Sequence, residues 1–199
     1  MPGFSLLDLS SALGLAATGV LTVNLLLGML LSTAYGRNPY WKRLPARVRH
    51  ARLDRLHNWT AYVALGLVAL HPALLLFDPA TKFTLPDILW PVHAPHQRLF
   101  VALGAAAFYA LLLVLISTQK AVKRRLGHRR WKALHLVSYA TALLFLVHGV
   151  AMDPLLKDRP IDFFDAEKIL SEGCLLVLAV ATAYRIRYQR ARRPRPIAA

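Results

Sequence analysis

The sequence predicts an all-α integral membrane protein of five transmembrane helices, with its N-terminus outside and its C-terminus in the cytoplasm. Three observations predict this class. Of the 199 residues, 56% are hydrophobic. Five apolar stretches come close to the roughly 20 residues that a helix needs to cross a hydrocarbon core of about 30 Å. The formal net charge of +15 is gathered into blocks between these stretches.

The apolar stretches set the expected spans. The last of them contains Glu172 and is the shortest. We expect residues 1–190 to form one membrane domain and residues 191–199, which are basic and proline-containing, to form a disordered tail. The expected spans are about 10–35, 56–77, 99–118, 134–152 and 169–185.

The charged residues alternate with the spans. Three segments (between spans one and two, between spans three and four, and after span five) hold 20 of the 25 lysines and arginines, and Asp54 is their one acidic residue. The positive-inside rule places these segments in the cytoplasm. A basic chain could instead bind nucleic acid. Here the basic blocks flank stretches of bilayer length, so we expect lipid and no nucleic acid as a partner, in a bacterial inner membrane.

Four histidines lie inside predicted spans, where an ionisable side chain usually faces the bundle interior. His57 and His135 lie near the cytoplasmic ends of the second and fourth spans, and His71 and His148 near the outer ends. Haem iron takes imidazole ligands from facing helices, so the pattern predicts b-type haem at one pair or at both. Cys174 is the sole cysteine, which excludes a Cys-x-x-Cys-His site for covalent haem attachment.

The two histidine spacings differ in helical phase. Fourteen residues advance about 1400°, so the pair on the second span shares a face; thirteen residues leave the pair on the fourth span about 140° apart. We expect the fourth helix to be overwound or bent, or else to approach the two porphyrins from different flanks; Gly149, next to His148, could permit a distortion. Pro72, directly after His71, is expected to kink the second helix.

Other polar residues are weaker candidates. Arg55 at the inner end and Arg98 at the outer end could bind haem propionates, because arginine binds carboxylates bidentately; both could equally anchor helix ends at the interface. The remaining histidines are expected on loops: His50 and His128 in cytoplasmic segments, and His93 and His96 outside, where metal binding or an electron acceptor is the alternative.

With these histidines in view, the chain resembles the ferric reductase-like transmembrane family, which includes NADPH oxidases and ferric reductases. In that family two helices carry histidine pairs at the same two spacings that separate His57 from His71 and His135 from His148 here. The family core commonly has six spans, and removing the first would give five spans with the N-terminus outside. The resemblance implies two haems, or one, that pass electrons across the membrane.

A local likeness points to the haem-binding membrane subunits of bacterial methionine-sulfoxide reductase systems. This chain departs from those subunits at His57, which they lack, and the departure favours two haems. The similar residues are Ser117-Thr118-Gln119, Leu126-Gly127, Arg130-Trp131, Leu134-His135, His148 and His71.

The sequence offers no dinucleotide-binding motif. It contains no Gly-x-Gly-x-x-Gly, and only the short segment 186–199 follows Arg185, so we expect no flavin or NAD(P)H domain in this electron-transfer subunit. Its electrons would come from a cytoplasmic flavin reductase or a membrane quinol. Its acceptor would be an outer protein, ferric iron or oxygen. A transporter or scaffold whose histidines bind metal or protons is the alternative, although spans two to four contain no Asp or Glu.

Overall fold

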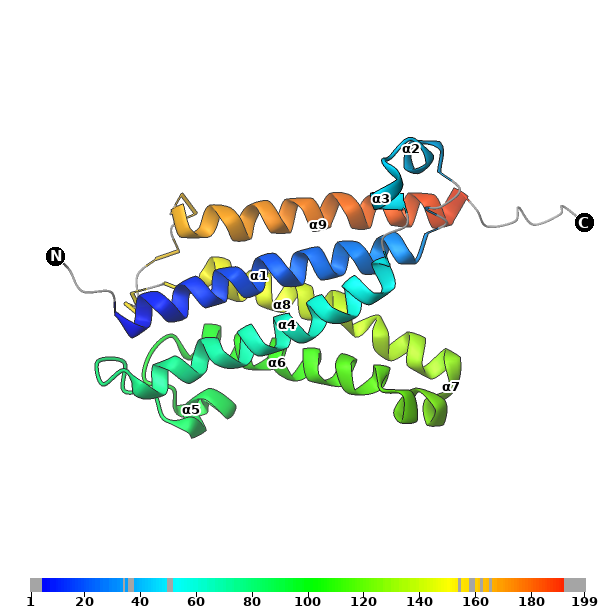
Figure 1. Ribbon diagram of the computed structural model, residues 1–199. Helices are drawn as coiled ribbons and strands as arrows, with labels where there is room; N and C mark the ends of the chain where they lie inside the picture. The colour runs from blue at the N-terminus through cyan, green and yellow to red at the C-terminus, as the bar shows by residue number, and fades with distance from the viewer. Residues whose placement is uncertain are drawn as a thin grey trace, which may run out of the picture.

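The computed structural model is a bundle of long helices that lie side by side (Figure 1). It describes residues 5–33, 35, 38–49, 52–153, 155–157, 160–161, 163–164 and 166–191. The elements in chain order are α1 (Leu6–Leu31), α2 (Pro39–Lys42), α3 (Ala46–Arg49), α4 (Leu53–Ala73), η2 (Leu74–Phe77), α5 (Leu85–Leu89), η3 (Pro91–His93), α6 (Arg98–Thr118), α7 (Lys120–His135), α8 (Val137–Ala151) and α9 (Ala166–Ala191).

Five helical segments of the described chain are long and apolar enough to cross a bilayer: Leu6–Leu31, Leu53–Phe77, Arg98–Thr118, Lys120–Ala151 and Lys168–Ala191. Large apolar side chains on their outer surface, such as Leu143, Leu176 and Val180, are more than half exposed. Such an apolar surface is stable against lipid. The backbone N–H and C=O groups also remain paired inside the bilayer, because they hydrogen-bond within each helix. The predicted class, an all-α integral membrane protein of five helices, is confirmed.

The first span begins and ends earlier than expected. A capping box starts α1 at Leu6, because the Ser5 hydroxyl accepts from the Asp8 amide while the Asp8 carboxylate accepts from the Ser5 amide. Such a box satisfies amides that the first helical turn leaves unpaired. The helix ends at Leu31 rather than near residue 35. The last helix is longer than predicted, because its polar final turns stay helical to Ala191.

Helices pair closely within the bundle. α1 packs against α4 and α9, and α6 packs against α8, whereas α4 and α8 are not close neighbours within the described chain. The buried core contains Leu21, Leu111, Leu146 and Leu178, one each from α1, α6, α8 and α9. This arrangement leaves α4 and α8 facing each other across the interior.

The basic segments share one end of the bundle. In Figure 1, α2, α3, α7 and the end of α9 lie at one end, and α5 and the start of α1 lie at the other. α5 is capped by Thr84, whose hydroxyl and backbone amide donate to the Asp87 carboxylate and lower its pKa. The positive-inside rule would place the basic end in the cytoplasm, and this orientation stays a prediction.

The fourth span consists of two consecutive helices. α7 ends at His135 and α8 begins at Val137, with Leu136 between them. The helix runs without a break through Gly149, and a distortion at that residue stays a prediction. The backbone also turns at Gly127, whose φ of 72° favours glycine. On the second span, α4 ends one residue after Pro72 and tightens into the 3-10 turn η2.

Three glycines let helices approach histidine rings. A β-carbon built on Gly104 of α6 would lie 2.9 Å from Cε1 of His148. Built on Gly14 or Gly28 of α1, it would lie 3.1 Å from the ring of His71 or of His57, respectively. Membrane helices pack closely where their interfaces are lined by small residues. These glycines therefore set how near α1 and α6 come to the histidines.

The orientation can be tested by labelling. In a Cys174→Ser background, a membrane-impermeant maleimide added to intact cells should label Lys82→Cys and leave Lys42→Cys unlabelled until the membrane is opened, because positive-inside topology puts the basic end in the cytoplasm. Both lysines are exposed. Labelling in the reverse order would overturn the orientation.

A second prediction concerns the glycine contact. Gly104→Ala should lower the thermal unfolding midpoint of the purified protein, with a cost of about 1–3 kcal/mol for overpacking. Gly66→Ala is the matched control, because its β-carbon would have nothing within 4 Å; it should leave the midpoint unchanged or slightly higher. Equal midpoints for the two variants would show that the Gly104 contact does not constrain packing.

Candidate functional site

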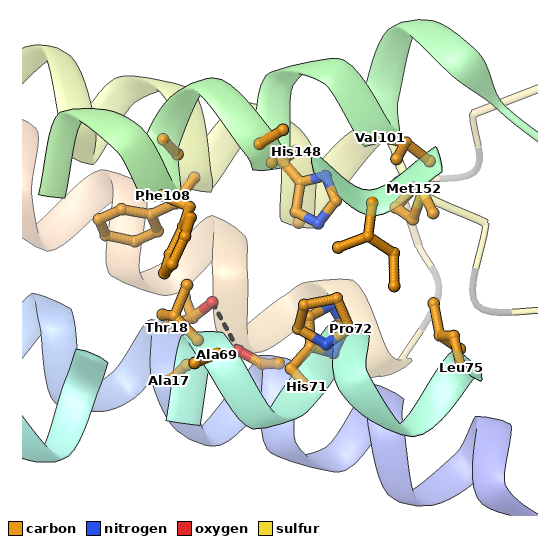
Figure 2. A pocket seen from close by; sticks show the side chains of 18 of the residues that line it. Ala17, Thr18, Ala69, His71, Pro72, Leu75, Val101, Phe108, His148 and Met152 are labelled. Atoms are coloured by element: carbon orange, nitrogen blue, oxygen red, sulfur yellow. Dashed lines mark hydrogen bonds between the residues drawn. The ribbon is translucent and has the colours of Figure 1, made fainter. Parts of the chain in front are cut away.

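The four histidines of the predicted spans come together as two facing pairs. The ring centroids of His57 and His135 lie 6.3 Å apart with an interplanar angle of 75°. Those of His71 and His148 lie 6.4 Å apart at 74°. We call the first the inner pair and the second the outer pair. Figure 2 shows the outer rings pointing toward one another from α4 and α8.

Each ring but one is held by a main-chain carbonyl, and His71 shows how. Its Nδ1 lies 2.7 Å from the carbonyl oxygen of Ser10 on α1. The Ser10 hydroxyl in turn donates to the carbonyl of His71 at 2.8 Å. Gly14, one turn further along α1, makes room for the ring. A side chain at that position would block the ring from the carbonyl four residues before it.

The same arrangement occurs twice more. Nδ1 of His57 lies 3.0 Å from the carbonyl oxygen of Asn24, with Gly28 four residues later. The amide of Asn24 also donates to the hydroxyl of Thr60 at 2.8 Å, which ties α1 to α4. Nδ1 of His148 lies 2.7 Å from the carbonyl oxygen of Phe100, and Gly104 follows four residues later.

These hydrogen bonds determine which nitrogen is free to bind a ligand. A carbonyl oxygen only accepts hydrogen bonds, so Nδ1 must carry the proton in His57, His71 and His148. In the neutral ring the other nitrogen, Nε2, then keeps its lone pair. A metal-bound histidine is oriented in this way by the partner of its second nitrogen. Three of the four rings are therefore prepared as neutral ligands.

His135 is positioned differently. Its Nδ1 is buried and has no hydrogen-bond partner in the described part of the chain. Trp131, one turn earlier on α7, stacks on its ring with centroids 5.4 Å apart and planes at 26°. Lys123 covers Trp131, with its nitrogen 3.7 Å from the ring centroid. Stacking takes the place of the carbonyl contact here.

A cavity of about 300 Å³ opens between the outer histidines, within the range of about 300–1,000 Å³ for small-molecule and cofactor sites. Helices α1, α4, α6, α8 and α9 all line it, mostly with apolar side chains such as Val68, Phe108 and Phe145. Figure 2 shows His71, His148 and Phe108 around this space. It is shaped for an apolar molecule held at its centre by imidazoles.

The ring spacing suits a metal ion between each pair. Imidazole nitrogens about 2 Å from a shared first-row metal, with about 1 Å more to each ring centre, place the centroids about 6 Å apart. Two rings in direct edge-to-face contact have centroid distances in the same range, so the distance alone does not indicate a metal ion. For the outer pair, the cavity between the rings is a second, independent indication of a bound ligand. In the described residues no group of three metal-binding side chains comes together.

The other predicted residues lie away from the rings. Arg55 is exposed on the first turn of α4, and Arg98 is exposed with its Nε donating to the carbonyl of Ala94 at 3.2 Å. His93 is exposed at the end of η3, and the ring of His96 lies 6.2 Å from that of Phe83. His128, on α7, lies 5.7 Å from Trp131, and His50 lies outside the described residues.

Sequence reasoning missed the residues that hold the histidines. The interval from Ser10 to Asn24 on α1 equals the interval from His57 to His71 on α4, and Gly14 and Gly28 repeat it. That shared interval could have identified α1 as the partner of α4. Sequence reasoning also missed Lys168 on α9, which is 4% exposed and lines the cavity of the outer pair; no pattern in the sequence indicates that this lysine turns inward.

Comparisons with known proteins identify a family for the chain. Residues 13–146 match the family described as ferric reductase like transmembrane component, a range that includes three of the four histidines. The chain is 35% identical over 101 residues to the protein-methionine-sulfoxide reductase heme-binding subunit MsrQ of Azospira oryzae, covering 49% of this chain and 39% of that protein.

The protein of the same name from Deinococcus radiodurans is 36% identical over 104 residues, covering 48% of this chain and 50% of that protein. The chain thus spans half or less of the length of these two relatives. No solved structure matches it. Because the family match covers well over half of the residues and most of the first four transmembrane segments, the chain belongs to the ferric reductase-like transmembrane family.

Proposed function

We propose that this protein is a b-type cytochrome subunit that carries electrons across the membrane, from a donor at its basic end to an acceptor at the opposite end. His71 and His148 would hold one haem, and His57 and His135 a second. The observation that carries the proposal is the repeated geometry: two histidine pairs, 6.3 and 6.4 Å between ring centroids, on helices that are not otherwise close neighbours.

The chain's own residues would prepare both sites. The carbonyls of Ser10, Asn24 and Phe100 hold the proton on Nδ1 and raise the basicity of the ligating nitrogen. The apolar lining of the outer cavity excludes water, which tunes the potential of a redox group bound there. When bound, haem supplies one-electron transfer through its iron, and the protein contributes ligation and environment.

The surfaces of the two ends suggest the partners. The basic end would attract an acidic cytoplasmic donor by electrostatic steering, such as a flavin reductase; a quinol reaching the protein from the bilayer is the other donor. The relatives' names describe a haem-binding subunit of a methionine-sulfoxide reductase. That supports a partner oxidoreductase as the acceptor, ahead of ferric iron or oxygen.

A reduced-minus-oxidised spectrum tests the proposal directly. Membranes or purified protein carrying the full chain should show the Soret and α bands of six-coordinate haem b after dithionite reduction, because each pair offers two imidazoles. A correctly folded preparation, supplied with haem, that gives no such bands would overturn the cytochrome proposal and leave a transporter or scaffold.

The number of haems follows from single variants. His57→Ala should lower the haem content from about two per chain to about one, and His71→Ala should do the same through the other site, since one lost axial ligand weakens one pair only. His93→Ala is the control, because that ring is exposed. Pyridine haemochrome assay against protein concentration gives the ratio, and an unchanged ratio in His57→Ala would remove the inner site.

The stacking on His135 gives a further prediction. Trp131→Ala should weaken the inner site and spare the outer one, because Trp131 is the side chain that orients the ring of His135. The matched control is Trp59→Ala, an exposed tryptophan on α4. The loss should appear as partial haem content, and placing Trp131→Ala in the His57→Ala background should cause no further loss. Further loss in that background would mean that Trp131 acts on the outer site.

A further inference from the structure

Lys168 is a buried lysine whose ammonium meets no counter-charge among the described residues. It lies in the first turns of α9 and is 4% exposed. Among the residues that the structure describes, no carboxylate lies within ion-pair distance of its ammonium, and its side chain makes no hydrogen bond to them. A buried charge is costly unless it is paired. An anion bound beside Lys168 would therefore stabilise its buried charge.

A hydroxyl without a hydrogen-bond partner among the described residues lies near Lys168. Ser171, three residues later and so on the same face of α9, is fully buried, and its Oγ has no hydrogen-bond partner in the described chain. This Oγ lies against Gly149, the residue after the histidine of α8, since a β-carbon on that glycine would be 3.1 Å from it. Lys168 and Ser171 thus offer a cation and a hydroxyl donor side by side.

Both residues line the cavity between His71 and His148. Most of the remaining lining is apolar, and the hydroxyls of Thr18 and Thr141 in it donate to carbonyls of their own helices. Within the described lining, Lys168 is the one lysine or arginine. An anionic group of a molecule held between the imidazoles would find its partner on α9 and nowhere else along the described wall.

We propose that Lys168, assisted by Ser171, binds a carboxylate of the porphyrin held by the outer histidine pair, an assignment that rests on the proposed function. The ligand class is a planar apolar metal chelate with carboxylate side chains. Lys168 would carry the ion pair and Ser171 a hydrogen bond to the same group. α9, which supplies none of the four histidines, would then close the outer site, while Arg98 stays at the surface bonded to Ala94.

The test uses the full chain in nanodiscs, in a His57→Ala background that keeps the outer pair alone. Apoprotein is loaded with iron protoporphyrin or with its dimethyl ester, and release to apomyoglobin is followed at the Soret band. With Lys168 present, the free acid should dissociate about 10- to 100-fold more slowly than the ester, because the ester cannot form the buried ion pair and leaves Lys168 unpaired. Lys168→Met should remove this difference, and Lys168→Arg should retain most of it.

Control variants separate the outcomes. Lys157→Met changes an exposed lysine near the same end of the bundle and should keep the preference for the free acid; Ser171→Ala should reduce it. If the His57→Ala protein binds porphyrin but Lys168→Met keeps the full preference, the carboxylate assignment is wrong and the haem site stands. If neither protein binds porphyrin, the proposed function itself fails at the outer pair.

Discussion

The hydrogen bond from a histidine Nδ1 to a main-chain carbonyl of a neighbouring helix is the interaction on which the rest of the interior depends. It occurs for His57, His71 and His148 at 2.7–3.0 Å. In a helix the carbonyl of residue i already accepts from the amide of residue i+4, and it can accept a second hydrogen bond only where position i+4 leaves room for the ring. Glycine at that position makes the contact possible in all three cases.

This constraint explains the pairing of helices. α1 has to lie close to α4 over much of its length, because it supplies a carbonyl and a glycine at two levels, one for each histidine of α4. α6 has to lie close to α8 for the same reason at the outer level. Each histidine helix is then held from behind by its own support helix, so that α4 and α8 stay apart and present their rings to the space between them.

The two levels are built unequally. The outer level has both rings held by carbonyls, a cavity of about 300 Å³ and a buried lysine in its wall. The inner level holds His57 in the same way but leaves Nδ1 of His135 unpaired and relies on Trp131. The equivalent glycine is missing on α6. Ser117 stands at that position, because the interval from Gly104 to Ser117 equals the interval from His135 to His148. A carbonyl partner gives a ligand greater basicity than stacking does, so the two sites should differ in potential.

The sequence by itself determined the membrane class, the five spans and the pairing of histidines by depth, because span length and charge asymmetry reflect the bilayer directly. The interval between His57 and His71 also placed two rings on one face. Only the tertiary structure decided that both histidines of the fourth span face their partners despite their out-of-phase interval, and which lysine enters the cavity. Both features depend on contacts between helices that are far apart in the chain. The backbone of α1 or α6 contacts the histidine rings there, and no sequence motif marks these contacts.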